Sequence, residues 1–455
     1  MPVERAPDEL RRARLVARVG DVTQRRRHAT SGPSRLLVLD GAYSLDTIRS
    51  RGLEQVVTSR DLDGFFDHVW TVHPAVGASP EHATTPSIGR PSSSPVAPHH
   101  TMVEGKVGRF RRLQRFPKVN FAVGQALTIW YLWRLVRSEH VSLIGSTEPL
   151  YLGMIGLLLA RVSRLPLVVT IIANHDAMYE TLREATYPRL FRYRSVERWI
   201  ERRVLSSADM VVVGSEDNRR YALDNGARPD RVRQFRFGEL IHPSHFQGPE
   251  ERPSVREELG IGERPFLLTV SRLARVKHPE DVIEVFAEAR KEVPSLVAVM
   301  VGDGPMRSEL ERRARELSVD DGLVLVGTRD QAWIARALAS ASVIVSPVTG
   351  RALVEASLSG RPIVAYDFEW QSEFISSGHD GIVVPYRDTR EMAAAVCRLL
   401  REPGLAAALG ARARNKTLET WSPEANKAQK VREFSRLLQL TEAPPSAQAP
   451  SVRAD

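Results

Sequence analysis

Short apolar runs rich in β-branched residues alternate with amphipathic segments along most of the chain. This pattern is typical of parallel strands joined by crossover helices. A first series predicts strands at 36–40, 69–72, 141–145, 167–172 and 210–214. The pattern then restarts and predicts strands at 266–271, 296–302, 323–327, 343–346, 363–366 and 381–384. The sequence therefore predicts an α/β protein with two open parallel sheets in series.

The boundary between the two sheets is predicted in a polar, proline-bearing stretch at 243–263. We expect a Rossmann-like N-terminal domain over 34–245 and a Rossmann-like C-terminal domain over 246–421. An amphipathic segment at 422–440 follows with no strand after it, so it can pack back on the first domain. Open α/β sheets bind ligands at the carboxyl ends of their strands, which places the expected site in a central cleft between the domains.

Three segments have the composition of irregular structure. Residues 1–33 are rich in Arg and residues 441–455 in Pro, Ala and Ser, and both are predicted to be disordered tails. Residues 74–100 have the same character and predict a long mobile loop inside the first domain. His99 and His100 lie in this loop without spaced partner ligands, so we expect no metal site there.

Cysteine content and hydropathy favour a cytoplasmic protein. Cys397 is the only cysteine among 455 residues, so no intrachain disulfide can form and a reducing compartment is favoured. Its position suits the buried face of a helix. Residues 1–33 lack the apolar core of a signal peptide, and the most apolar stretch, 143–173, is interrupted by charges and prolines. We therefore expect neither export nor a membrane-spanning helix.

The formal charge of +9 raises the question of anionic partners. No zinc-finger spacing, basic zipper or RNA-reading motif is present, which argues against nucleic acid. Residues 105–118 contain six basic residues and no acid, with Phe110, Leu113 and Phe116 interleaved. The segment can lie peripherally on an anionic membrane, such as the inner face of the plasma membrane. It can equally be a solvated loop anchored by its two phenylalanines. Its arginines are Arg109, Arg111, Arg112 and Arg115.

The strongest chemical signal is the segment VSRLARVKHPEDVIEVF, which begins at Val270. It predicts a strand end, a loop and a helix that starts near Pro279. Arg272 and Lys277 fall in the loop that feeds this helix N-terminus, where free N–H groups already favour an anion. The pair predicts a diphosphate site, whereas either cation alone would be read as a solvated loop charge.

Two further motifs follow in the second domain. In VGDGP, Gly302 can allow the backbone to approach a ligand, although a plain strand-to-helix turn explains it equally well. In SPVTGRALVEASLSGRPIVAYD, Glu355 lies one helical turn beyond Gly350 and Arg351. Its carboxylate can accept hydrogen bonds from ribose hydroxyls, or it can belong to a solvated helix face.

These motifs, in this order, resemble the C-terminal domain of glycosyltransferase family 4, whose members are retaining enzymes of the GT-B fold. The resemblance is close over 264–402 and includes EFISSGHDGIVVP at 373–385. The first half is similar only in pattern, through ANHD at 173–176 and VVVGSE at 211–216.

The resemblance implies a role for individual residues. Arg272 and Lys277 match the pair that neutralises the donor diphosphate, and Glu355 matches the glutamate that holds the donor ribose. His175 matches the histidine at the cleft face of the first domain, near the reacting sugar. The implied donor side consists of Arg272, Lys277, Gly302, Gly350, Arg351 and Glu355. The implied acceptor side consists of Gly41 and His175.

One departure from the family concerns the donor sugar. The family pairs two glutamates with seven residues between them, and the first contacts the sugar. Here Pro347 stands eight positions before Glu355, and no carboxylate occurs over 346–354. The sugar is then held by backbone N–H groups near Gly350 and Arg351, or the loop is shortened. The asparagine-glycine pair that often precedes the linker is also missing, and only Gly238 in FRFGEL is comparable.

Asp61 and Asp63 form a DxD triplet of the kind that holds a metal in another glycosyltransferase fold. Three-residue matches are common by chance, so we expect no metal and no cofactor. The sequence therefore predicts a hexosyltransferase-like enzyme that moves a sugar from a nucleotide sugar to a glycan, lipid-linked or small-molecule acceptor. A nucleotide-sugar epimerase or hydrolase, or a non-catalytic nucleotide-sugar-binding protein, are the alternatives.

Overall fold

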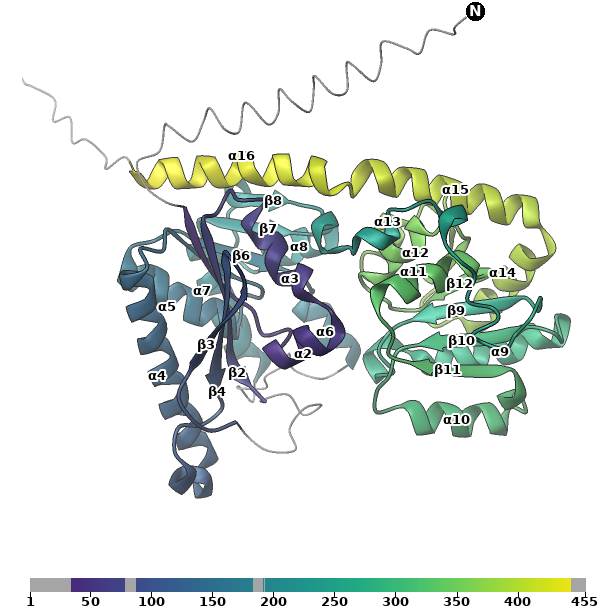
Figure 1. Ribbon diagram of the computed structural model, residues 1–455, viewed down its shortest axis with the longest axis horizontal. Helices are drawn as coiled ribbons and strands as arrows, with labels where there is room; N and C mark the ends of the chain where they lie inside the picture. The colour runs from purple at the N-terminus through teal and green to yellow at the C-terminus, as the bar shows by residue number, and fades with distance from the viewer. Residues whose placement is uncertain (1–33, 78–86, 183–190, 192, 443–455) are drawn as a thin grey trace, which may run out of the picture.

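The computed structural model describes residues 34–77, 87–182, 191 and 193–442. These residues form two α/β domains side by side, joined at one end by a long helical segment (Figure 1). The predicted tail 1–33 and residues 443–455 of the predicted C-terminal tail lie outside the described residues. Residues 441 and 442 belong instead to the last helix.

The first domain is built on an eight-stranded sheet with the order β3-β4-β2-β1-β5-β6-β7-β8. Every neighbouring pair is parallel except β3 and β4. Leu37 on the central strand pairs with Trp70 on one side and Ile144 on the other. The strands are β1 (Arg35–Leu39), β2 (His68–Val76), β3 (Ser92–Ala97), β4 (His100–Lys106), β5 (Leu143–Ser146), β6 (Leu167–Ile171), β7 (Met210–Val213) and β8 (Val232–Gln234).

The prediction of a mobile loop over 74–100 is wrong at both ends, because β2 continues to Val76 and a further strand begins at Ser92. Residues Ser92–Ala97 form the edge strand β3, which pairs antiparallel with β4 from Ser92↔Glu104 to Ala97↔His100. Pro95 is tolerated because an edge strand needs no partner on its outer side. His100 is buried at the start of β4. Residues 78–86 lie outside the described part of the chain.

Helices cover both faces of the first sheet. The long helix α4 packs against α5, and α5 packs against α7 (Figure 1). Leu132, Ile155 and Val204 carry these contacts into the core. The helices are α2 (Leu45–Arg51), α3 (Glu54–Thr58), α4 (Pro117–Ser138), α5 (Tyr151–Ser163), α6 (His175–Leu182), α7 (Arg194–Ser207) and α8 (Glu216–Asp224).

The second domain is built on a six-stranded sheet, parallel throughout, with the order β11-β10-β9-β12-β13-β14. Each strand lies within one residue of its predicted bounds, because each is a continuous apolar run. The inner strands are buried, whereas the edge strands β11 and β14 are largely half-buried. The strands are β9 (Phe266–Val270), β10 (Val297–Val301), β11 (Leu323–Gly327), β12 (Val343–Ser346), β13 (Ile363–Tyr366) and β14 (Ile382–Val384).

The helices of the second domain lie on both faces of its sheet (Figure 1). They are α9 (Pro279–Glu292), α10 (Arg307–Glu316), α11 (Gln331–Ser340), α12 (Ala352–Leu358), α13 (Gln371–Phe374), α14 (Thr389–Arg401) and α15 (Pro403–Thr420). Cys397 is buried on α14, which packs on α9, as the pattern predicts. Within the described ranges, no helix is both long and apolar enough to cross a bilayer.

The last helix, α16 (Pro423–Glu442), continues from α15 along the first domain (Figure 1). Phe434 packs edge-on against Phe66, with ring centroids 5.6 Å apart, and Glu433 accepts from Arg233 Nε at 2.8 Å. The backbone at Gly238 passes very close to the backbone just before this helix. A Cβ built at Gly238 would lie 1.9 Å from the Trp421 carbonyl oxygen. Only glycine fits there, so the 238 turn and the α15–α16 junction stay in contact.

Candidate functional site

The loops that follow the strands of the two sheets meet between the domains. Helix α13 makes the direct connection, where Glu373 accepts from the backbone N–H of Glu216 at 2.6 Å. Arg236 of the first domain also approaches Glu373, with Nη2 3.5 Å from Oε1. These contacts bring the residues after β7 and β8 against α13, which follows β13.

Arg272 and Lys277 lie in the loop between β9 and α9, as predicted. Arg272 is exposed and Lys277 is half-buried. Burial, more than any neighbour, lowers the pKa of the Lys277 ammonium; Glu369 opposes this shift and Arg272 adds to it. A Cβ built at Gly350 would lie 3.7 Å from Lys277 Nζ. The loops after β9 and β12 therefore meet at this ammonium group.

The two acids in the first turn of α9 point to partners inside the second domain. Asp281 accepts from Tyr366 Oη at 3.0 Å and from Arg387 Nη2 at 2.8 Å. Glu280 Oε1 lies 3.4 Å from His278 Nδ1. Asp281 is thus engaged by β13 and by the residues after β14, and Glu280 by the loop before α9.

Gly302 serves the packing of the protein itself. Its φ is +134°, and a Cβ there would lie 1.9 Å from the carbonyl oxygen of Ser271. The loop after β10 passes this closely beside the loop that contains Arg272. The structure therefore supports the turn-and-packing explanation of VGDGP, and it shows that Gly302 fixes the backbone next to the cationic loop.

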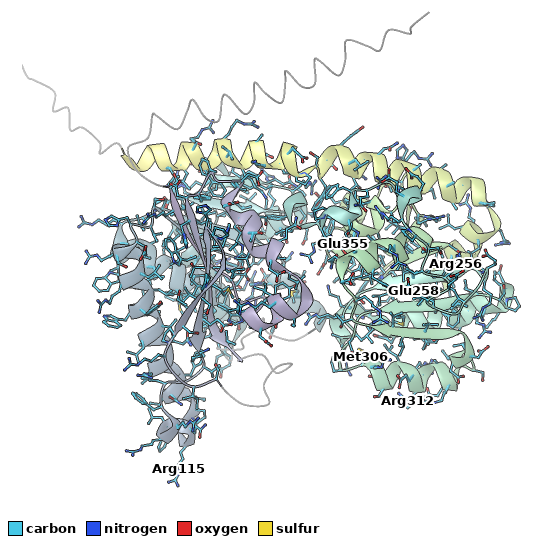
Figure 2. The ribbon with its side chains drawn as sticks, viewed as in Figure 1. Arg115, Arg256, Glu258, Met306, Arg312 and Glu355 are labelled. Atoms are coloured by element: carbon cyan, nitrogen blue, oxygen red, sulfur yellow. The ribbon has the colours of Figure 1, made fainter. Side chains whose placement is uncertain are left out.

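Glu355 is buried in the first turn of α12, with 3% of its surface exposed. Its Oε1 lies 3.3 Å from Arg351 Nε, one helical turn earlier. The interpretation as a solvated face residue is therefore wrong. Glu355 lies on the side of the second domain that faces the first (Figure 2).

Pro347 stands where the family carries its first glutamate, and its backbone carbonyl accepts a hydrogen bond from a buried side chain. Gln371 donates through Nε2 to the Pro347 carbonyl oxygen at 2.7 Å and to the Tyr366 carbonyl oxygen at 3.1 Å. Ser346 Oγ donates to Gln371 Oε1 at 3.2 Å. The loop after β12 is therefore fastened to the loop after β13, and Gln371 is buried between them.

His175 begins α6 and is buried in a charged network that the sequence did not predict. Its Nδ1 lies 2.7 Å from Glu201 Oε1, and Arg194 donates to the two oxygens of Glu201 at 2.9 and 2.8 Å. Burial would raise the pKa of Glu201, but the hydrogen bonds and charges of His175 and Arg194 outweigh it and lower the pKa. The ring of His175 is thereby fixed by α7.

A second carboxylate of the first domain links this network to the donor side. Asn174, next to His175, donates to both oxygens of Asp217 at 3.2 Å. Burial raises the pKa of Glu369, the charge of Lys277 opposes this shift, and the charge of Asp217 adds to it. The surroundings of His175 and of Lys277 therefore border the same space between the domains.

The remaining candidates of the first domain are Gly41 and the two DxD aspartates. Gly41 is exposed after β1, and a Cβ there would meet only Leu152, at 3.9 Å. Asp63 pairs with Lys427, whereas Asp61 Oδ2 lies 3.9 Å from His100 Nε2. The two DxD carboxylates therefore have different partners. Across the described ranges, no three His, Cys, Asp or Glu side chains gather in a geometry that could hold a metal ion.

The basic segment 105–118 forms a defined tip of the first domain. Buried Asn120 accepts from the backbone N–H groups of Arg109 and Phe110 at 2.8 and 3.0 Å. Phe110 and Phe116 are 47% and 63% exposed, so the interpretation as a loop anchored by its phenylalanines is wrong. Arg115 marks the outer end of this tip (Figure 2).

The fold of the chain resembles that of solved glycosyltransferases. Sucrose-phosphate synthase from Thermosynechococcus elongatus superposes with a TM-score of 0.68 at 19% identity, over 90% of this chain and 100% of that one. Anabaena HepE in complex with UDP-glucose superposes with a TM-score of 0.63 at 15% identity, over 88% of this chain and 99% of that one. The architecture is the GT-B fold.

Similar curated proteins include the alpha-D-kanosaminyltransferase of Streptomyces kanamyceticus, which is 30% identical over 54% of this chain and 64% of that protein. The GDP-mannose-dependent alpha-(1-6)-phosphatidylinositol monomannoside mannosyltransferase of Mycolicibacterium smegmatis is 32% identical over 38% of this chain and 48% of that protein. The matches thus span about half to two thirds of these relatives. Residues 48–238 match the glycosyl transferase 4-like domain, and residues 251–416 match the glycosyl transferases group 1 family. With both domains matched in order, the chain belongs to glycosyltransferase family 4.

Proposed function

We propose that the protein transfers a sugar from a nucleotide-sugar donor held by the C-terminal domain to an acceptor held mainly by the N-terminal domain, with retention of configuration. The observation that carries the proposal is the position of Lys277. This half-buried cation lies beside Gly350 and close to Glu369, opposite the His175 network. A diphosphate bound there would satisfy a charge that the protein compensates only in part.

Each residue has a specific task in this proposal. Arg272 and Lys277 stabilise the negative charge that develops on the diphosphate when its bond to the anomeric carbon breaks. Glu355, held by Arg351, accepts hydrogen bonds from the ribose hydroxyls. The acceptor oxygen forms the new bond to the anomeric carbon as the bond to the diphosphate oxygen breaks, and its proton passes to the departing diphosphate. His175, oriented by Glu201, faces the reacting sugar from the acceptor side.

We further propose that transfer requires no metal ion, because Arg272 and Lys277 supply the positive charge that a metal would otherwise bring to the leaving group. Turnover should be unchanged when EDTA replaces magnesium in the assay. Loss of turnover in EDTA that added magnesium restores would contradict this part of the proposal.

The activity can be tested with labelled UDP-glucose and GDP-mannose, each incubated with the protein in the presence and absence of a bacterial lipid and glycan extract. The proposal predicts a labelled product that forms only when extract is present. Release or isomerisation of the sugar without extract would favour the hydrolase or epimerase alternative. Donor binding without any turnover would favour the non-catalytic alternative.

We propose a lipid-linked acceptor at an anionic membrane. The helices α4, α5 and α7 expose apolar side chains on the outside of the first domain, and this outer helical face is continuous with the basic tip at 105–118. Trp199 is 68% exposed, Val162 54% and Trp130 52%. Two relatives, the mannosyltransferase above and an alpha-monoglucosyldiacylglycerol synthase of Streptococcus pneumoniae, have lipids in their names.

The charge of the outer helical face complements an anionic surface. Helices α4 and α5 contain no Asp or Glu, and the two glutamates of α7, Glu197 and Glu201, are buried and paired with Arg194. The exposed charges of these helices include Arg134, Arg137, Arg161, Arg202 and Arg203. Cations around exposed tryptophans are the combination that binds anionic lipid headgroups.

Sedimentation with vesicles tests this surface. The protein should bind vesicles that contain phosphatidylglycerol but not pure phosphatidylcholine, and binding should fall at high salt. Changing Arg109, Arg111, Arg112 and Arg115 to Ser should abolish it. The control changes Arg312 and Arg315 to Ser on α10, in the other domain (Figure 2). Binding that ignores lipid charge and salt, or equal loss in the control, would contradict the membrane proposal.

A further inference from the structure

We infer that Glu369 supplies the carboxylate that contacts the donor sugar, in place of the acid that is missing at Pro347. This inference rests on the proposed function. Glu369 lies in the loop between β13 and α13, two residues before Gln371. Because Gln371 donates to the Pro347 carbonyl oxygen, this loop lies directly beside the position that lacks the acid.

The residues on both sides of Glu369 are fixed by packing. The ring of Phe368 stacks on Tyr386 with centroids 4.3 Å apart. Trp370 packs against Phe374 at 5.3 Å and against Trp421 at 6.2 Å. With Gln371 held by two backbone carbonyls, the segment cannot shift without breaking several contacts. Glu369 is therefore presented by a rigid loop.

The backbone of Glu369 has a φ of +52°, in the left-handed region. Residues with a Cβ rarely adopt this conformation, and glycine would adopt it without strain. Strained residues persist where their surroundings determine them, and they gather at functional sites. A glutamate at a position that suits glycine is consistent with a side chain that has a function.

The surroundings of Glu369 suit contact with an uncharged, hydroxyl-bearing group. The side chain is half-buried between Lys277 of the donor loop and Asp217 of the first domain. A sugar attached to a diphosphate at Lys277 would extend from that cation toward the first domain, and so past Glu369. A carboxylate there accepts hydrogen bonds from sugar hydroxyls, and these bonds are stronger than those between neutral groups.

The test compares the affinities for UDP and UDP-glucose, and for GDP and GDP-mannose, by calorimetry. In Glu369→Gln we expect the affinity for the preferred nucleotide sugar to fall about tenfold, the equivalent of one lost charge-assisted bond. The affinity for the corresponding diphosphate should stay within about twofold, because its contacts are made by Arg272 and Lys277. Asp367→Asn, an exposed residue of the same loop, is the matched control and should change neither affinity.

Glu369→Gly separates the side chain from the strained backbone. Glycine accepts a φ of +52°, so this variant should fold with an unchanged or raised melting temperature and should lose the same affinity for the nucleotide sugar. An unchanged nucleotide-sugar affinity in both variants, or equal losses for sugar and diphosphate, would overturn the inference. A wild-type protein that binds neither UDP nor GDP would instead contradict the donor site itself.

Discussion

Charged groups line both sides of the space between the domains, but the two domains hold them differently. In the first domain, His175, Glu201 and Arg194 form a closed network in which Glu201 is wholly buried. In the second domain, Arg272 is exposed and Lys277 is half-buried beside Glu369. Buried charges must be paired to be tolerated, whereas partly exposed cations can bind an anion. The first arrangement sets a side chain in place, and we propose that the second binds the donor diphosphate.

The largest effect expected from this contrast is on stability. Glu201→Ala removes the carboxylate that buried His175 shares with Arg194, although Arg194 keeps Asp176 and Glu197. We therefore expect the free energy of unfolding of the first domain to fall by about 3 kcal/mol, the lower end of the cost of breaking a buried pair. Urea unfolding measures it. The control is Glu288→Ala, which breaks an exposed pair with Lys291 and should cost at most about 1 kcal/mol. Similar urea midpoints for Glu201→Ala and Glu288→Ala would contradict the view that the Glu201 network stabilises the protein more than an exposed ion pair does.

The second effect is on ligand binding. Arg272→Ala and Lys277→Ala should each weaken the binding of a nucleoside diphosphate by about 10- to 100-fold, the equivalent of one charge-assisted contact. Binding of the nucleoside should hardly change. Arg275→Ala, an exposed cation of the same loop, is the control for calorimetry. If nucleoside and diphosphate lose affinity equally, both residues are structural.

A smaller effect is expected at Glu355. Glu355→Gln keeps the size of the side chain and removes its charge, so the fold should remain intact while kcat/KM falls about tenfold through a weaker hold on the donor ribose. The measurement is initial rates over a range of donor concentrations, with circular dichroism as the check on folding. Wild-type kinetics in this variant would exclude Glu355 from the donor site.

Raising the pH should weaken the binding of a diphosphate to the second domain. Because the pKa of Lys277 lies below its ordinary value of 10.5, the ammonium loses its proton as pH rises through that lowered pKa, and diphosphate affinity should fall there. Lys277→Arg keeps its charge and should move this loss to higher pH. Calorimetry between pH 7 and 10 would show it. Identical pH profiles of diphosphate affinity for the wild type and Lys277→Arg would exclude Lys277 as the titrating group.

Lowering the pH should reduce the stability of the first domain. The pKa of Glu201 is lowered in the folded state, so its contribution to stability is present above the unfolded value near 4.5 and is lost as pH falls through the folded pKa. Wild-type urea midpoints should therefore decline below about pH 4.5. Glu201→Gln should flatten this decline. An equally steep decline in that variant would assign it to other carboxylates.

Most strands of the two sheets could be predicted because each is a local apolar run. Strands β3, β4 and β8 were missed: β3 carries serines and a proline that only an edge position tolerates, and β8 is an edge strand of three residues. The basic pair Arg272 and Lys277 and the acid Glu355 could be proposed as site residues because their motifs are local in sequence. Glu201 meets His175 from 26 residues away. The role proposed for Glu369 rests on its positive φ and on the contact between the loops after β12 and β13, and no sequence pattern reveals either feature.

The central claim is that the second domain holds a nucleoside diphosphate through its phosphates, and a thermal-shift comparison of UDP and GDP with uridine and guanosine tests it most directly. A ligand at 100 times its Kd stabilises the folded state by about 2.7 kcal/mol. The account predicts that at least one diphosphate raises the melting temperature by several degrees, while its nucleoside at equal concentration produces little shift. Equal shifts for the diphosphate and its nucleoside, or no shift with either diphosphate, would contradict it.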